Sequence, residues 1–481
     1  MGISFGPEIG RRTFLGSLAA AAAAVGAGTG SRDARTAEPV RFPDGFLWGA
    51  STSSYQIEGA AEAGGRGPSI WDTFSRTPGK VLNGDTGDIA CDHYNRYLED
   101  VALMANAGLK AYRFSVAWPR IQPTGQGPAN AAGLDFYDRL VDALLRRGIE
   151  PWPCLYHWDL PQALQDRGGW VTRAAADRFA DYALIVAGRL GDRVKNWVML
   201  NEPSVVAIFG HGTGGHAPGL TGRDNYMAAI HHQNLAQGRA LQALRQAGGR
   251  DWRLGTVLSV QPVWPVGNSD ANRGAAASWD AVWNRSCLDP LFKGSYPDLL
   301  VSEVRPLIKG DDLAVIRQPI DFLGLNYYSR MHQQVDPAGL FGTGFGPAPA
   351  GTKHTDMGWP VEPDGLYEQL IDLRDHYGNP EVHVTENGAS YGDWVNPKSG
   401  KVEDGARIFF LRDHLLACRR AIAEGCNLKG YFTWTLLDNF EWGYGYTQNF
   451  GLVQVDRQTM ERRPKASYYW YGDVAKTNTV P

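Results

Sequence analysis

Short apolar segments with the composition of buried β-strands recur along the chain. They are rich in Val, Leu, Phe and Tyr, and longer segments with apolar residues at helical spacing separate them, such as 97–107, 133–147 and 172–190. The strand-like segments are residues 46–51, 111–118, 150–157, 195–202, 253–260, 320–328, 381–386 and 428–436. Strands that alternate with helices in this way predict a parallel sheet buried on both faces.

Eight such segments predict an α/β fold, a single (β/α)8 TIM barrel with loop insertions at the C-terminal face of the strands. A division into seven or nine strands is also compatible with the pattern. We expect the barrel to occupy residues 40–475 and a tail to occupy 476–481. Residues 268–306 and 339–363 carry many Gly, Pro and Trp residues, and we expect them to form loops above the barrel mouth.

The first 39 residues have a different composition. Arg11 and Arg12 precede an Ala-rich apolar run at 17–27, and small residues follow it. This order is typical of an export signal, and the run is too short for a stable membrane anchor. The paired arginines resemble a twin-arginine signal, so we expect an exported protein, periplasmic or secreted. A chance Arg pair before a disordered leader is the alternative, and the cleavage site stays open.

The overall composition is that of an ordinary globular enzyme, with 43% hydrophobic residues, 20% charged residues and a net charge of −4. The near-neutral balance argues against nucleic acid as a partner. Sixteen tryptophans supply core volume, and they also suit the stacking of sugar rings. The five cysteines have no metal-ligand spacing; Cys418 and Cys426 are close enough in sequence to pair, but we favour buried thiols.

Two of the predicted strands end on a glutamate, Glu202 in one and Glu386 in the other. Removing an ionised carboxylate from water costs several kcal/mol unless a partner compensates, so charges at these positions need a reason. In TIM barrels the active site lies at the C-terminal ends of the strands. The two glutamates are therefore predicted to face each other across one site.

Two carboxylates with different pKa values can cleave an acetal, one as a proton donor and the other as a nucleophile. Arg113 and Tyr328, also at strand ends, are predicted to hold Glu386 charged, and Asn326 lies beside them. Glu202, close to that charge and backed by apolar residues, should have a raised pKa.

Five motifs resemble those of family 1 glycoside hydrolases, the β-glucosidases and their relatives. They are FLWGASTSSYQIEGA at 46–60, HWDLP at 157–161, LNEP at 200–203, VTENG at 384–388 and LLDNFEW at 436–442. The resemblance runs in order from about residue 42 to residue 470. It implies a retaining double displacement with Glu202 as acid/base and Glu386 as nucleophile, whose carboxyl groups should lie about 5–5.5 Å apart.

The same resemblance implies a glycone subsite. Its members hold sugar hydroxyls or contact the ring, with Trp434 stacked beneath it; they are Gln56, His157, Trp158, Asn201, Trp434, Glu441, Trp442 and Phe450. A carboxylate at Glu441 would also repel a 6-phosphate, which argues against phosphorylated sugars.

We therefore predict a retaining exo-β-glucosidase that acts on a small β-glucoside or oligosaccharide. The alternatives are a β-galactosidase or β-fucosidase, a transglycosidase on the same scaffold and, least favoured, a non-catalytic sugar-binding protein. No cofactor is implied, and His231 and His232 lack the carboxylate spacing of a metal site, so we predict no metal. The sequence leaves the oligomeric state and the aglycone open.

Overall fold

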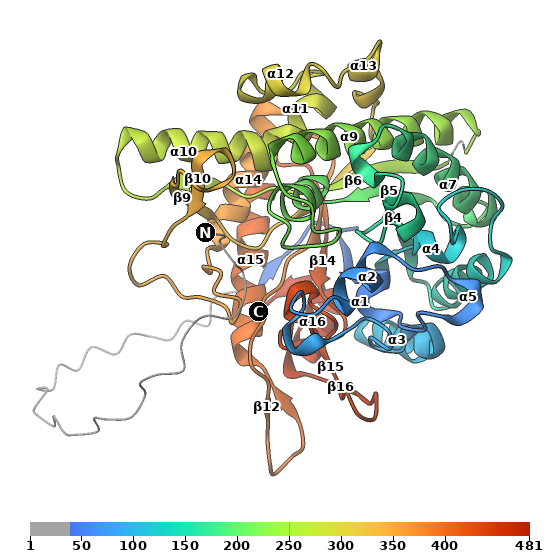
Figure 1. The fold of residues 1–481 in the computed structure, drawn as a ribbon. Coiled ribbons are helices and arrows are strands. Elements are labelled where there is room, and N and C mark those ends of the chain that lie inside the picture. Colours follow the sequence, from blue (N-terminus) through green and yellow to red (C-terminus); the bar gives the residue numbers. More distant parts are fainter. Residues whose placement is uncertain (1–38, 250) are drawn as a thin grey trace, which may run out of the picture.

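The computed structural model describes residues 39–249 and 251–481. Eight parallel strands form a closed barrel in chain order, which confirms the predicted (β/α)8 fold. Figure 1 shows the strands at the centre of the molecule and the helices around them. The barrel strands are β2 (Leu47–Ser51), β3 (Ala111–Ser115), β4 (Glu150–Tyr156), β5 (Asn196–Asn201), β6 (Arg253–Ser259), β8 (Phe322–Asn326), β11 (Val382–Glu386) and β14 (Leu428–Trp434).

The longest helices cover the outside of the barrel, and short helices occupy the connections. The helices are α1 (Ser54–Ile57), α2 (Ile70–Arg76), α3 (His93–Ala107), α4 (Trp118–Ile121), α5 (Ala131–Arg146), α6 (Gln162–Gln165), α7 (Ala174–Leu190), α8 (Pro203–Val205), α9 (Arg223–Gln246), α10 (Asp270–Asp280), α11 (Ser286–Phe292), α12 (Asp298–Val304), α13 (Asp312–Ile316), α14 (Pro363–His376), α15 (Gly405–Ala423) and α16 (Ala466–Thr477). The amphipathic segments read from the sequence coincide with α3, α5 and α7.

The interior of the barrel is apolar towards the N-terminal ends of the strands. The Trp152 ring lies 4.9 Å from the Phe322 ring and 5.3 Å from the Phe432 ring, measured between ring centroids. Side chains on one face of a strand recur every second residue, so Phe322 and Asn326 both point inward from β8. Aromatic rings therefore fill the barrel near the N-terminal ends of its strands, and polar groups line it near the C-terminal ends.

One insertion differs from its prediction. Residues 268–306 are mostly helical rather than looped, because they contain α10, α11 and α12. The Ser269 hydroxyl accepts a hydrogen bond from the Asn272 N–H and caps α10, and Trp279 on the same helix is buried. Residues 339–363 are largely irregular, apart from a 3-10 turn at Leu340–Gly342 and the short strand β10 (Thr343–Phe345). The strand β10 pairs with β9 (Met331–Val335), which pairs in turn with β7 (Val263–Pro265).

The C-terminus also differs from its prediction. The predicted tail at 476–481 is wrong, because β17 (Thr479–Val480) pairs antiparallel with β1 (Val40–Arg41) and Val480 is buried. A two-residue strand has no periodic pattern that a sequence could reveal. The barrel domain thus extends to the end of the chain.

Several smaller features lie outside the barrel wall. The strands β12 (Trp394–Val395) and β13 (Val402–Glu403) form a hairpin that projects from the body in Figure 1, and β15 (Val453–Val455) pairs with β16 (Arg462–Pro464). The five cysteines are buried and free. Within the described residues no helix is long and apolar enough to cross a membrane. The predicted export signal lies outside the described residues except for Pro39.

Asn478 should contribute to stability, because its amide joins the segment before β2 to the residues after α16. Its Oδ1 accepts a hydrogen bond from the Trp48 indole at 2.9 Å, and its Nδ2 donates to the Phe42 and Pro43 carbonyls. We expect Asn478→Gly, which tolerates the positive φ of 55°, to lower the free energy of unfolding by about 1–3 kcal/mol.

Thermal unfolding at a fixed heating rate measures this effect. The exposed Asn268→Gly serves as the matched control, with an unchanged midpoint. Equal midpoints for both variants would show that the C-terminal contacts do not stabilise the barrel.

Candidate active site

Glu386 is the last residue of β11, and two donors fix its carboxylate. The Arg113 guanidinium donates to Oε1 at 2.5 Å, and the Tyr328 hydroxyl donates to Oε2 at 2.6 Å. Arg113 comes from β3, which β14 and β2 separate from β11 in the barrel, and it is completely buried. The structure confirms the predicted meeting of these three residues, since both oxygens of Glu386 are held in a fixed orientation.

Glu202 follows β5 directly and has a left-handed backbone, with φ of 51°. Its N–H donates to the Val257 carbonyl at 2.9 Å, which ties the residue to β6. The Asn326 amide donates to Glu202 Oε1 at 2.9 Å and to Asn201 Oδ1 at 3.1 Å. Left-handed backbone is uncommon for a non-glycine residue and is held only where the surroundings over-determine it, as at many functional sites.

Burial and charge act together on Glu202. Its pKa is raised to about 8, first because burial removes water from the carboxyl group and second because the Glu386 charge repels a second one. The sequence anticipated both causes, and the structure gives burial the larger share. Glu202 is therefore largely protonated at neutral pH.

The segment directly after β11 packs tightly against β14. A side-chain methyl group at Gly388 would lie 1.8 Å from the Trp434 carbonyl oxygen, so only glycine fits there. The Trp434 N–H also donates to the Asn387 carbonyl at 3.0 Å. This close approach fixes Trp434 relative to Glu386.

Gln56 and the residues after β14 form a second polar group. The Gln56 amide donates to Asn439 Oδ1 at 3.2 Å and to Glu441 Oε2 at 3.4 Å. The pKa of Glu441 is raised to about 8, by burial first and by the Glu386 charge second. Glu441 is therefore largely protonated at neutral pH, and the electrostatic case against a phosphorylated sugar, which assumed a charged Glu441, is weakened.

His157 and three tryptophans form an aromatic wall beside this group. The His157 ring lies 5.9 Å from the rings of both Trp434 and Trp442, nearly parallel to each, and Trp158 lies 4.5 Å from Trp442. Burial and the Arg113 charge lower the pKa of His157 well below its usual value, so the imidazole is neutral. Trp158 and Trp442 have positive φ angles of 78° and 47°.

Phe450 packs beside Tyr328 and Trp359 at the C-terminal face of the barrel. Its ring lies 6.3 Å from that of Tyr328 and 6.0 Å from that of Trp359, which comes from the long irregular segment 339–363. The described contacts therefore link every residue of the predicted site to another member of it.

Three supporting residues were missed from the sequence. Ser53 donates to Gln56 Oε1 at 2.6 Å, Thr385 donates to Asn326 Oδ1 at 2.8 Å, and the Gln261 oxygen accepts from the Tyr328 N–H at 3.2 Å. Ser53 and Thr385 lie within the quoted motifs, so their neighbours were a usable signal. Gln261 follows β6, a strand end that carried no recognised motif.

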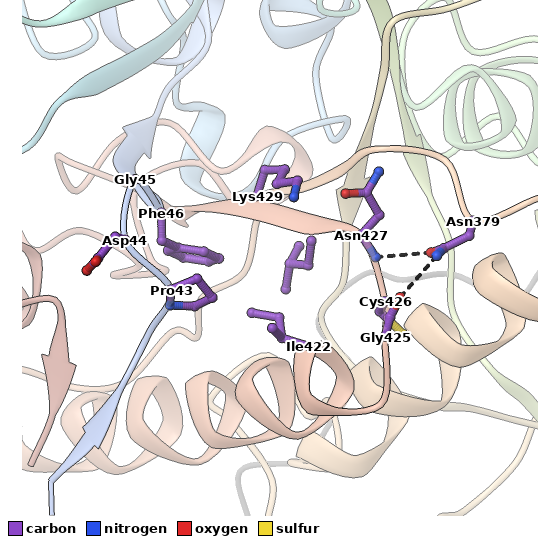
Figure 2. A pocket seen from close by; sticks show the side chains of 11 residues that line it. Pro43, Asp44, Gly45, Phe46, Asn379, Ile422, Gly425, Cys426, Asn427 and Lys429 are labelled. Carbon is purple, nitrogen blue, oxygen red and sulfur yellow. Dashed lines mark hydrogen bonds between the residues drawn. The ribbon is translucent and has the colours of Figure 1, made fainter.

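A cavity of about 340 Å³ lies at the opposite end of the barrel (Figure 2). It opens near the starts of β2 and β14, and none of the predicted site residues lines it. Its lining consists of Pro43, Asp44, Gly45, Phe46, Asn379, Ile422, Gly425, Cys426, Asn427, Leu428 and Lys429. Active sites of TIM barrels lie at the other face, so we assign no part of the chemistry to this cavity.

No cluster of three or more His, Cys, Asp or Glu side chains in the described part of the chain could hold a metal ion. His231, considered above as a ligand, instead contacts the Tyr296 hydroxyl at 3.1 Å and Asp312 at 3.3 Å. These contacts tie α9 to the connection between α11 and α12 and to the start of α13, which is a structural role.

A parallel barrel with two buried glutamates at its C-terminal face, one protonated and one held by an arginine and a tyrosine, defines a carboxylate-dependent glycosidase. The chain belongs to Glycosyl hydrolase family 1, whose sequence profile matches residues 38–480.

Similar proteins extend over nearly the whole chain. Beta-glucosidase A of Thermotoga maritima is 47% identical, with 91% of this chain and 98% of the relative covered. A bifunctional beta-D-glucosidase/beta-D-fucosidase of Bifidobacterium breve is 45% identical, with coverage of 89% and 97%. The solved structure of the Thermotoga maritima beta-glucosidase in complex with glucoimidazole has a TM-score of 0.87 at 46% identity, with coverage of 91% and 99%.

Protonation of Glu202 can be followed through activity. A rise in pH through its pKa of about 8 removes the proton from the acid form, so we expect kcat/KM for an aryl β-glucoside to fall above about pH 8, approaching tenfold per pH unit. Glu202→Gln cannot titrate, and on a substrate with an activated leaving group its profile should lack this alkaline limb.

The pH–rate profiles of both proteins measure this difference. If the limb persisted in Glu202→Gln, another group, such as Glu441, would be the one that titrates.

Proposed function

We propose that this family 1 glycosidase is a retaining exo-β-glucosidase, which releases terminal non-reducing β-D-glucosyl residues from glucosides or oligosaccharides. The observation that carries the proposal is the contrast between the two glutamates. Glu202 is buried and protonated, whereas both oxygens of Glu386 accept hydrogen bonds from Arg113 and Tyr328. These are the states that an acid and a nucleophile need.

In the first step a Glu386 oxygen attacks the anomeric carbon while the bond to the leaving oxygen breaks, and Glu202 gives its proton to that oxygen. A covalent glucosyl ester on Glu386 results. In the second step Glu202, now a carboxylate, takes a proton from water. The water oxygen attacks the anomeric carbon, the ester bond breaks and Glu386 is restored. Two inversions leave the configuration of the sugar unchanged.

A separate group of residues binds the glycone, the sugar whose anomeric carbon Glu386 attacks. Gln56, His157, Asn201, Glu441 and Trp442 supply the hydrogen-bonding groups for its hydroxyls, and Trp434 lies beneath the ring. A protonated Glu441 can donate one hydrogen bond as well as accept others, and the neutral His157 can do the same. Trp158 and Phe450 complete the walls.

The relatives support a glucoside as the preferred substrate. The Thermotoga maritima enzyme binds glucoimidazole, and the Bifidobacterium breve relative is named for both β-glucoside and β-fucoside hydrolysis. We therefore propose β-glucosides first and β-fucosides as a second substrate of the same site. Transfer to a sugar acceptor would use the same two glutamates and differ only in the exclusion of water.

Removal of the nucleophile should abolish hydrolysis. We expect Glu386→Gly to lower kcat for an aryl β-glucoside by at least about 10³-fold, since no covalent intermediate can form. Added azide should restore turnover by occupying the space of the carboxylate, and the product should be the α-glucosyl azide, which NMR identifies.

Glu368→Gly is the matched control. Glu368 lies on α14, outside the five motifs, and its carboxylate pairs with Arg330. It has no part in the proposed chemistry. Its kcat should be close to that of the natural protein. Full hydrolysis by Glu386→Gly, or a β-configured azide, would contradict the assignment.

We also propose that the protein is exported through the twin-arginine route. The support is the sequence of residues 1–39 alone, with Arg11 and Arg12 before the Ala-rich run. We expect this segment, fused to a reporter that folds before export, to deliver it across the membrane, and the double substitution Arg11→Lys/Arg12→Lys to retain it in the cell. Export of the double variant at the normal level, measured by fractionation, would refute the route.

A further inference from the structure

A buried ionic cluster lies behind the active site and takes no part in the proposed chemistry. Lys465 precedes α16, and its ammonium lies 2.8 Å from Asp438 Oδ1 and 2.9 Å from Asp393 Oδ2. The Lys465 side chain is 0% exposed, and those of Asp393 and Asp438 are 3% and 10% exposed. Arg407 and Asp404, paired at 2.8 Å, complete the cluster, and Arg407 lies 3.6 Å from Asp393.

One carboxylate of the cluster belongs to the segment that follows the nucleophile. We call residues 387–393 the nucleophile loop, because they continue directly from Glu386 to Asp393. Arg407 donates to the Ala389 carbonyl within this loop. Both cations of the cluster therefore hold the nucleophile loop, Lys465 through Asp393 and Arg407 through the backbone.

A second carboxylate of the cluster belongs to the segment that carries two of the proposed glycone-binding residues. We call residues 435–442 the glycone loop, which carries Glu441 and Trp442. Asp438 in this loop accepts hydrogen bonds from Lys465 and, at 2.7 Å, from the Gly451 N–H next to Phe450. Its neighbour Asn439 accepts the hydrogen bond from Gln56 described above. Lys465 thus joins the two loops through a single ammonium group.

Stability alone does not account for this arrangement. Two cations face three carboxylates, and three polar atoms of the cluster lack a hydrogen-bond partner in the described residues: Asp393 Oδ1, Asp438 Oδ2 and Arg407 Nη2. Buried ion pairs often stabilise a fold no better than apolar side chains of the same size, because of their desolvation cost. Such a cluster does fix the positions of its members, because moving them apart would leave a buried charge without a partner.

We propose that Lys465 is a positioning residue, whose ammonium sets the distance between the glycone loop and the nucleophile loop by binding Asp438 and Asp393 together. The inference rests on the proposed function, since it concerns how the sugar is placed against Glu386. Small displacements of a bound sugar have large effects, because the reacting atoms must lie within a few tenths of an ångström of their productive positions.

The test is the double variant Lys465→Met/Asp438→Asn, which removes one charge of each sign and so keeps the net charge of the cluster. Met fills the space of the lysine stem, and Asn can still accept from the Gly451 N–H. We expect the inhibition constant of glucose, which reports binding in the glycone subsite without catalysis, to rise by about tenfold or more. KM for an aryl β-glucoside should rise with it, and kcat should fall by a smaller factor.

A second variant, Asp438→Asn alone, removes the charge that ties the glycone loop to Lys465 and leaves Lys465 bound to Asp393. It should raise the inhibition constant of glucose, and KM with it, by a smaller factor than the double variant does. This variant keeps the proposal testable if the double variant fails to fold.

The matched control is Arg173→Met/Asp312→Asn. This ion pair also contains a buried carboxylate, but its contacts among the described residues join the start of α7 and His231 of α9 to the start of α13 and reach neither loop. It should lower the thermal midpoint and leave glucose inhibition within twofold of the natural protein.

The outcomes separate the two proposals. A natural protein without activity on β-glucosides would overturn the proposed function. An active natural protein whose Lys465→Met/Asp438→Asn and Asp438→Asn variants, folded and assayed well below their midpoints, keep the normal inhibition constant of glucose would overturn the positioning role alone.

Discussion

The structure depends on one buried cation, Arg113, at the mouth of the barrel. Its guanidinium is completely inaccessible to water and donates to Glu386 and to Asn201, the residue before Glu202. A buried guanidinium without carboxylate and amide partners would be strongly unfavourable. Arg113 therefore requires β5 and β11, two strands far apart in sequence, to present their polar ends to the same point. Glu202, which follows Asn201, is thereby brought close enough to Glu386 for that charge to raise its pKa.

Several of the remaining site residues have a backbone conformation that is uncommon for their residue type. Glu202, Trp158 and Trp442 all adopt positive φ angles, and Gly388 lies against the Trp434 carbonyl where no side chain fits. Each of these positions is held by neighbours that make hydrogen bonds or ring contacts. Strain of this kind persists only in a rigid frame, which the aromatic plug and the parallel strands below provide.

Much of this could be predicted from the sequence, for identifiable reasons. The barrel strands are buried on both faces, so each appears as a compact apolar segment, and the eight predicted segments match the eight strands. The predictions failed where the signal was short or mixed. The segment 268–306 was expected to form loops because of its Gly, Pro and Trp content, yet Trp279 and its neighbours pack as a helix. The C-terminal strand β17 was read as a tail because two residues show no period.

The sequence by itself singled out Glu202 and Glu386 as candidate reactive groups, because a glutamate at the end of an apolar strand needs a chemical reason wherever the strand lies. It also determined the family, through motifs that keep their order along the chain. The tertiary structure decided the protonation of Glu441, since burial depends on which residues cover it. It also decided the role of Lys465, whose two partners lie 27 and 72 residues away in sequence. Charge state and position depend on long-range contacts, which local sequence patterns do not encode.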